Sequence, residues 1–190
     1  MAATQPQHQQ PQTFTVSYYT AADLPAIEEQ LIEVYAEVYA AEAAKDSFFS
    51  VERFTDRLHR HVSGSRWGCA LGTAEGAPIG YAYGFARNSS YQWGGLITPV
   101  PADLIAENDT RTFALCEVMV RQNWRGTGTA HTLHEELLSH RPEERSHLLV
   151  EEEHPRVRAL YERWGYNAMG VMQPYDDGPR YTSMLRPIVL

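Results

Sequence analysis

The sequence predicts one mixed α/β domain, and three observations support that fold class. The chain has 190 residues, which is close to the usual size of a single domain, and no linker or internal repeat divides it. Stretches typical of strands and stretches with helical spacing both occur along its length. After residue 112 they alternate, which is typical of a partly parallel sheet, whereas hairpin-like pairs on either side predict antiparallel strands.

The N-terminal half is predicted to contain a strand, two helices and a hairpin. β-Branched and aromatic residues indicate the first strand, apolar residues at helical spacing indicate the helices, and a turn with Gly76 and Pro78 indicates the hairpin. Thr20 or Asp23 could cap the first helix. The expected bounds are Phe14–Tyr19 for the strand, Leu24 to about Ala44 for the first helix, a shorter helix after Ser50, and Trp67–Thr73 and Ile79–Ala86 for the hairpin.

The C-terminal half is predicted to alternate strands and helices. Residues 88–110 before it are long and polar, which is typical of a functional loop. The domain is expected over residues 13–190, and the Gln- and Pro-rich residues 1–12 are expected to be a disordered tail. The expected elements are a strand at Phe113–Val120, a helix at Gly128–His140, a strand at His147–Glu152, a helix at Pro155–Trp164, and strands at Tyr166–Gln173 and Arg180–Arg186.

Composition argues against several functional classes. With 16 Lys and Arg against 24 Asp and Glu, the formal net charge is −8, which argues against nucleic-acid binding and suits a cationic substrate. Cys69 and Cys116 lie in strand-like runs and are expected to be buried free thiols. The start of the chain does not have the pattern of a secretory signal, and no apolar run approaches the roughly 18 residues of a membrane helix. We therefore expect a cytoplasmic protein that does not enter membranes.

The most informative stretch is Val118–Ala130, where an apolar strand passes through a Gly-containing turn into a helix. Such a turn leaves several N–H groups unpaired at the helix N-terminus, and these form an anion site that typically binds a pyrophosphate. Gly126 and Gly128 allow close approach, and Arg125 adds charge. An ordinary glycine turn is the alternative. A P-loop is excluded because the chain has no Gly-Lys pair, and a dinucleotide fingerprint is disfavoured because His131 replaces its third glycine.

This stretch resembles the signature of the GCN5-related N-acetyltransferase (GNAT) superfamily, [QR]-x-x-G-x-[GA], which Arg125-x-x-Gly128-x-Ala130 fits at every fixed position. The segment ALYERWGY at 159–166 is similar to the family's A-L-Y-E-x-x-G-F motif, with Tyr166 in place of Phe. The predicted order of elements also agrees, so the resemblance covers nearly the whole chain. It implies the GNAT fold, a mixed and mostly antiparallel sheet of about seven strands with about four helices on its faces, and acetyl-CoA as co-substrate without a metal.

The resemblance also implies roles for individual residues. Glu117 would take a proton from the substrate ammonium, and Tyr161 would protonate the departing thiolate. The plainer alternatives are an exposed strand residue for Glu117 and a packed aromatic for Tyr161. The implied cofactor-binding residues lie on the strand that pairs with pantetheine, in the turn that binds the pyrophosphate, and at a position where many relatives carry Asn: Val118, Met119, Val120, Arg125, Gly126, Thr127, Gly128, Thr129, Ala130 and His154.

The resemblance implies an amine acceptor, either a small molecule or a protein, and leaves a homodimer open. A non-catalytic CoA-sensing module with the GNAT fold is the alternative function. Aromatic and acidic residues near the family's acceptor region make Tyr83, Trp93 and Asp176 the candidate substrate-binding residues, since aromatic faces and carboxylates attract an ammonium group. A hydrophobic core with a polar loop is the plainer account of the same residues.

Two further clusters are predicted to be ordinary surface features. His131 and His134 are three residues apart on the expected helix, but no third metal ligand is evident, so a solvated helix face is favoured. The run Glu151–Glu153 ends a predicted strand near the expected cleft and is interpreted as a solvated group of charges.

Overall fold

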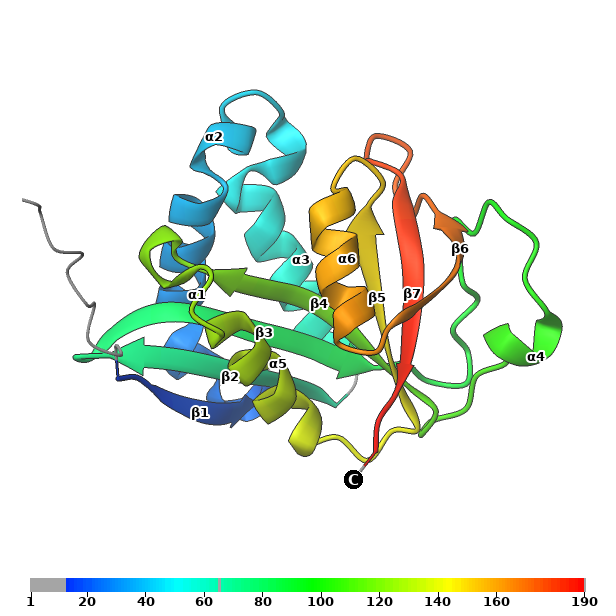
Figure 1. The fold of residues 1–190 in the computed structure, drawn as a ribbon, viewed down its shortest axis with the longest axis horizontal. Coiled ribbons are helices and arrows are strands. Elements are labelled where there is room, and N and C mark those ends of the chain that lie inside the picture. Colours follow the sequence, from blue (N-terminus) through cyan, green and yellow to red (C-terminus); the bar gives the residue numbers. More distant parts are fainter. Residues whose placement is uncertain (1–12, 65, 190) are drawn as a thin grey trace, which may run out of the picture.

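The computed structural model describes residues 13–64 and 66–189, so the tail predicted at 1–12 lies outside the described residues. A seven-stranded sheet forms its centre, and helices lie on both faces of the sheet (Figure 1). The elements in chain order are β1 (Thr15–Thr20), α1 (Leu24–Val38), α2 (Ala40–Ala43), α3 (Val51–Gly64), β2 (Trp67–Ala74), β3 (Ala77–Ala86), α4 (Ala102–Ile105), β4 (Thr112–Val120), α5 (Thr129–Ser139), β5 (Arg145–Glu151), α6 (Pro155–Arg163), β6 (Asn167–Met172) and β7 (Tyr181–Pro187).

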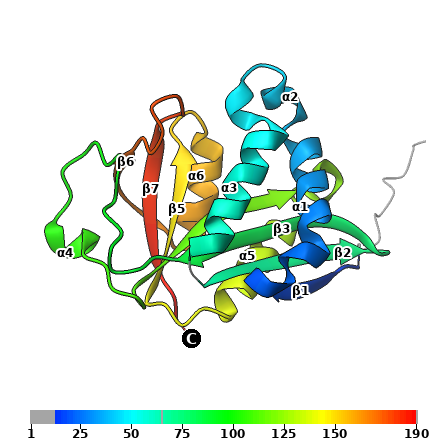
Figure 2. The same cartoon turned by 180° about the vertical axis from the view of Figure 1, so that it is seen from behind.

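The sheet is mixed and mostly antiparallel, which confirms the predicted fold class. Its strand order is β1-β2-β3-β4-β5-β7-β6, and among the described strands only β4 and β5 pair in parallel. Helices α1 and α3 cover the face seen in Figure 2, whereas α5 and α6 lie on the face toward the viewer in Figure 1. Each face therefore has its own hydrophobic core.

Strands β4 and β5 pair only briefly before they diverge. Thr112–Ala114 pair with Arg145–His147, and no further pair joins the two strands within the described residues. Beyond this point β4 continues along β3 and β5 continues along β7, so the two arms separate, as Figure 1 shows. One edge of the C-terminal half of β4 is consequently left without a strand partner, and the sheet is open there.

A β-bulge in β4 decides which way Glu117 points. Two neighbouring residues of β3 pair with Leu115 and Glu117, so Cys116 is the extra residue. Leu115 packs in the core on the α5 face, whereas Met119 packs in the core beneath α1 and α3. Glu117 is two residues from Met119 and therefore shares its face. Strict alternation from Leu115 would have turned Glu117 toward α5 instead.

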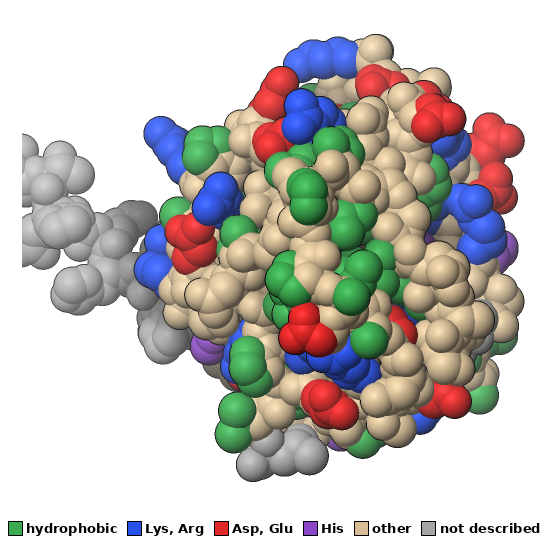
Figure 3. Space-filling view, turned by 90° about the vertical axis from the view of Figure 1, so that its right-hand side faces the viewer, with side chains coloured by type: hydrophobic (Ala, Val, Ile, Leu, Met, Phe, Trp, Pro, Cys, Tyr) green, Lys and Arg blue, Asp and Glu red, His purple; other side chains and the backbone are tan. Residues whose placement is uncertain are grey.

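The long segment 88–110 is packed against the sheet. It contains α4 and forms a bridge to β6, and its Trp93 is only 3% exposed. The carboxylate of Glu107 anchors the segment, since it accepts hydrogen bonds from Trp93 Nε1 and from Arg145 Nη2, both at 3.1 Å. On this side of the molecule, Figure 3 shows acidic and basic side chains interspersed with apolar ones.

The first helix is shorter than the sequence predicts. It ends at Val38, because the chain turns at Tyr39, whose ring stacks on Tyr35 and Phe49 with centroids 4.7 and 5.4 Å apart. Both cysteines are free thiols as predicted, with Cys69 fully buried and Cys116 partly so. None of the helices in residues 13–64 and 66–189 is long and apolar enough to cross a membrane.

Candidate active site

The open edge of β4 presents backbone groups of Val118 and Val120. Arg121 N donates to Ile79 O at 2.9 Å, so the backbone of Arg121 faces β3. In an antiparallel pair such groups alternate, and those of Val118 and Val120 therefore face the opening. Val120 O lies on that side, since it accepts a hydrogen bond from Arg125 Nε at 3.2 Å. The backbone of Met119, by the same alternation, faces β3, and its side chain is buried with 4% exposure.

The turn after β4 leaves a row of N–H groups free. Gly126 and Gly128 have φ of +77° and +89°, and Gly128 caps α5. No heavy atom lies within 4 Å of the position a Cβ would take at either glycine. Within the described residues, the amides of 126–131 have no hydrogen-bond acceptor. These amides form a cradle that suits an anion at the N-terminus of α5.

Threonine hydroxyls hold this turn in shape. Thr127 Oγ1 donates to Trp124 O at 2.7 Å and lies 2.7 Å from Thr129 Oγ1. The side chain of Thr129 is buried, at 1% exposure, so it supports the turn from below. Of the predicted cofactor residues, Gly126 and Gly128 thus offer open backbone, whereas the side chain of Thr129 is structural.

Glu117 is a half-buried carboxylate on the open arm of β4. It makes no hydrogen bond or ion pair with the described residues. Burial raises the pKa of Glu117 from 4.5 to about 7, while the Arg57 guanidinium lowers this pKa and the Glu151 carboxylate raises it. Arg57 itself donates to Tyr35 Oη and to Phe48 O, both at 3.3 Å. Glu117 is therefore not the fully exposed strand residue that was the plainer alternative. A carboxyl with this pKa can accept a proton near neutral pH.

Tyr161 lies on α6 with its ring packed and its hydroxyl free. The ring meets Trp164 and Tyr166 edge-on, with centroid separations of 5.1 and 5.7 Å. The hydroxyl has no hydrogen-bond partner among the described residues. Burial, and to a lesser extent the charge of Glu117, raise the pKa of Tyr161 above its ordinary value. The phenol therefore keeps its proton at neutral pH and can donate it.

Glu151 is a functional candidate that the sequence pattern grouped with Glu152 and Glu153 as solvated charges. It is half-buried at the end of β5, and burial, Glu153 and Glu42 raise its pKa, whereas His154 lowers it. His154 is exposed at the start of α6, with Nε2 3.8 Å from Glu151 Oε2. The end of β5 carries three consecutive glutamates, and only the position of Glu151 on the strand distinguishes it from its solvated neighbours.

Two of the three predicted substrate-binding residues, Tyr83 and Trp93, are buried, which contradicts the prediction that their side chains line the cleft. Tyr83 is 0% exposed in the core beneath α1 and α3, with its hydroxyl 3.3 Å from His61 Nδ1. Trp93 is 3% exposed, and its indole faces the guanidinium of Arg87 at 4.0 Å. Alternation along β3 turns Tyr83 inward, and the anchored 88–110 segment buries Trp93.

The third predicted residue, Asp176, is exposed in the loop between β6 and β7. Its neighbour Asp177 pairs with Arg53 at the start of α3, with Nη1 and Oδ2 2.7 Å apart. Tyr175 meets Phe48 edge-on at 5.8 Å, so this loop is docked against the segment that precedes α3.

His134 is buried, which corrects its prediction as part of a solvated helix face. Its Nε2 lies 2.8 Å from Tyr166 Oη, which in turn donates to Ser146 Oγ at 2.8 Å. His131 is half-exposed and tilts against Trp164. No group of three or more His, Cys, Asp or Glu in the described part of the chain could hold a metal ion.

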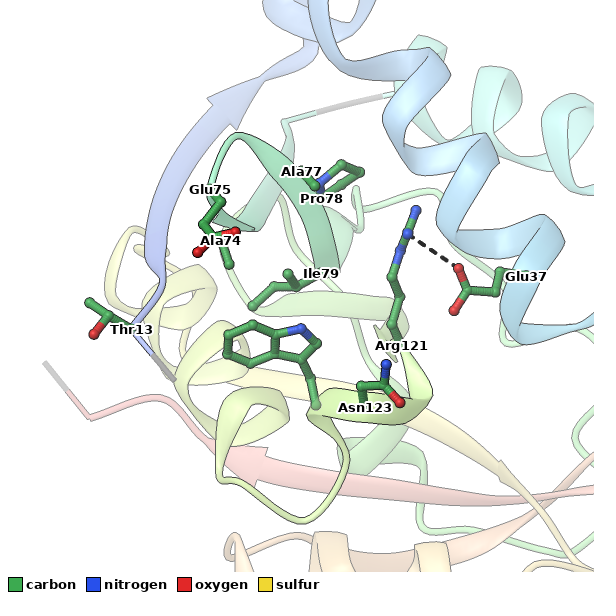
Figure 4. Close-up of a pocket in the computed structure, with 10 residues that line it drawn as sticks. Thr13, Glu37, Ala74, Glu75, Ala77, Pro78, Ile79, Arg121 and Asn123 are labelled. Atoms are coloured by element: carbon green, nitrogen blue, oxygen red, sulfur yellow. Dashed lines mark ion pairs between the residues drawn. The ribbon is translucent and has the colours of Figure 1, made fainter. Parts of the chain in front are cut away.

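A separate depression of about 440 Å³ lies beside the start of the signature turn (Figure 4). Arg121 extends across it toward α1 and pairs with Glu37, at 3.2 Å, and with Glu33. These ion pairs connect the end of β4 to α1 and thereby help to fix where the turn begins.

Comparisons with known proteins agree with this fold. Residues 102–186 match a family model described as an acetyltransferase (GNAT) domain, and solved GNAT acetyltransferases share the fold over most of the chain. Residues 102–186 thus match the GNAT acetyltransferase family, and the chain as a whole has the GNAT fold. A search of curated proteins gives no match.

Three solved structures illustrate the likeness. An acetyltransferase from Thermus thermophilus is 16% identical with a TM-score of 0.62, covering 94% of this chain and 99% of its own. The ribosomal-protein-S18-alanine N-acetyltransferase from Escherichia coli is 19% identical with a TM-score of 0.59, covering 94% and 96%. The PaiA N-acetyltransferase from Thermoplasma acidophilum, solved in complex with coenzyme A, is 14% identical with a TM-score of 0.54, covering 92% and 99%. At these identities the likeness concerns the fold.

Proposed function

We propose that this GNAT domain transfers an acetyl group from acetyl-CoA to an amine. One observation carries the proposal: the free amides of the turn, the unpaired edge of β4, and the unpartnered side chains of Glu117 and Tyr161 border the same divergence of β4 and β5. An anion cradle, an exposed strand edge, a base and an acid are the groups that this reaction needs.

The residues present fit the donor. The amides of 126–131 suit its pyrophosphate, and Gly126 and Gly128 leave room for close approach. Arg125 uses Nε for Val120 O, and its terminal nitrogens have no partner in the described residues, so they are available to a phosphate. Val118 can pair with the pantetheine arm as a neighbouring strand would. When bound, acetyl-CoA supplies the activated thioester carbonyl.

The side chains then divide the proton transfers between them. Glu117, with a pKa of about 7, accepts the proton that an ammonium group must lose before its nitrogen can attack. The N–H of Val118 faces the opening and would polarise the thioester carbonyl. Tyr161 keeps its proton until the thiolate departs, and then donates it. The acetyl group thus moves from sulfur to nitrogen in one direct transfer, with no covalent enzyme intermediate.

The test is an assay of thiol release from acetyl-CoA with a panel of primary amines, combined with calorimetry of acetyl-CoA binding. We expect binding in the absence of amine, and amine-dependent thiol release that falls at least a hundredfold in Glu117→Gln. Binding without thiol release for any amine would instead favour the CoA-sensing module.

A further inference from the structure

The two arms of the divergence each carry one carboxylate on the same face of the sheet. Glu117 is on β4 and faces the side of α1 and α3, as the bulge at Cys116 dictates. On β5, Val150 packs in the core on the opposite face, so the next residue, Glu151, also faces α1 and α3. The sequence could not predict that Glu117 and Glu151 face the same side of the sheet, because β4 and β5 pair only at their beginnings in the described residues.

Two tyrosine side chains lie near these carboxylates. Tyr181 is the cross-strand partner of Glu151 on β7 and shares its face. Burial raises the pKa of Tyr39, at the end of α1, and the charges of Glu117 and Glu151 raise this pKa further. Within the described residues neither Tyr39 nor Tyr181 has a hydrogen-bond partner for its hydroxyl. The hydroxyl oxygens of these side chains can each accept a hydrogen bond from an ammonium group.

The charges around this space are not balanced. Arg57 is the cation that acts on Glu117, and it is already held by Tyr35 and by a backbone carbonyl. Among the described residues the cationic neighbour of Glu151 is His154, with Nε2 3.8 Å away, and the exposed Glu42 of α2 adds a further negative charge. In contrast, the carboxylate of Asp177 in the β6–β7 loop is already paired with Arg53. The carboxylates between the two arms therefore lack the close ion pair that Asp177 has.

We propose that the acceptor is a dication, with its reacting amine beside Glu117 and a second ammonium group bound by Glu151. This inference rests on the proposed function, because it concerns the acceptor of the same site. A monoamine beside Glu117 would leave the half-buried Glu151 with the exposed His154, 3.8 Å away, as its cationic neighbour in the described residues. A second ammonium group on the same molecule would pair with Glu151 and donate to the hydroxyl oxygens of Tyr39 and Tyr181.

The experiment compares acceptors that differ by one charge. α,ω-Diaminoalkanes of three to six carbons are assayed by thiol release beside the n-alkylamines of the same length, with the full chain, with Glu151→Gln and with Glu144→Gln. Glu144 is exposed just before β5 begins, so its variant makes the same charge change at the other end of that strand. We expect at least one diamine to have a kcat/KM tenfold or more above its monoamine. In Glu151→Gln the KM of that diamine should rise about tenfold, with little change in kcat.

The outcomes separate the inference from the function on which it rests. Equal use of diamines and monoamines by the unaltered protein would overturn the dication but leave amine acetylation intact. A diamine KM that stays unchanged in a folded Glu151→Gln would also overturn the role of this residue, as would an equal rise in Glu144→Gln. If Glu151→Gln does not fold, the comparison of diamine and monoamine on the unaltered protein decides the matter. No transfer to any amine would instead contradict the proposed function itself.

Discussion

Replacing Glu117 with glutamine is expected to stabilise the fold at alkaline pH while removing most of the activity. The carboxyl of Glu117 is half-buried without a hydrogen-bond partner in the described residues, and burial raises its pKa from 4.5 to about 7. The ionised form that catalysis requires is therefore the form that the fold disfavours. Glutamine keeps the shape of the side chain but carries no charge.

The magnitude follows from that pKa. An increase from 4.5 to about 7 corresponds to about 3 kcal/mol of unfavourable free energy for the ionised carboxylate. Because the side chain is partly reached by solvent, and because the Gln amide is itself polar, we expect a gain of about 1–2 kcal/mol from Glu117→Gln above pH 8. For a chain of this length, each kcal/mol raises Tm by roughly 2–4 °C.

Thermal unfolding measured at pH 4.5, 6 and 8 tests the sign. Between pH 4.5 and 7 the folded state keeps a proton that the unfolded state releases, so the stability of the parent falls as pH rises through this window. Glu117→Gln lacks this loss. At pH 4.5 the Tm of the variant should differ from that of the parent only by the effect of replacing a neutral carboxyl with an amide. As pH rises, the Tm of the parent should fall relative to that of the variant, so the variant has the higher Tm at pH 8. Glu144→Gln, an exposed carboxylate, should follow the parent at every pH.

Kinetics complete the test. The kcat/KM of the parent should rise with an apparent pKa near 7, and that of Glu117→Gln should be lower by roughly 10²-fold or more. A Tm difference that does not change between pH 4.5 and pH 8 would refute the argument that a buried charge is tolerated here for catalysis.

Three further predictions concern the turn, the acid and the acceptor loop. Gly128→Ala should reduce acetyl-CoA affinity tenfold or more by calorimetry, about 1.4 kcal/mol, whereas Gly76→Ala, which also has φ near +80° and an open Cβ position, should cost similar stability with no change in affinity. Tyr161→Phe should lower kcat by roughly 10²-fold at unchanged stability. Tyr166→Phe should lose about 1–3 kcal/mol of stability, because the hydrogen bonds of the Tyr166 hydroxyl are buried. A loss of stability with unchanged kcat in Tyr161→Phe would make Tyr161 a core residue. Asp176→Asn should raise the amine KM several-fold in the thiol-release assay without affecting acetyl-CoA affinity, and an unaltered KM would mean that this exposed carboxylate is merely solvated.

The sequence determined the elements and the cofactor turn because these depend on local patterns. A strand, two glycines and a helix in immediate succession dictate free amides at a helix N-terminus, and the structure has them at 126–131. The second motif at 159–166 likewise lies on one helix and the turn after it. Local periodicity also predicted most strands to within two residues, since alternation and helical spacing extend over many positions.

The tertiary structure decided which side chains meet. One extra residue, Cys116, inverts the alternation of β4 and turns Glu117 toward α1 and α3. No pattern in the sequence marks that bulge. The divergence of β4 from β5 brings Glu151 to the same face of the opening, whereas tertiary packing buries the side chains of Tyr83 and Trp93. The physical reason is that a strand's own sequence fixes only its period. The face on which that period begins is set by bulges and by pairing with strands that are distant in the chain.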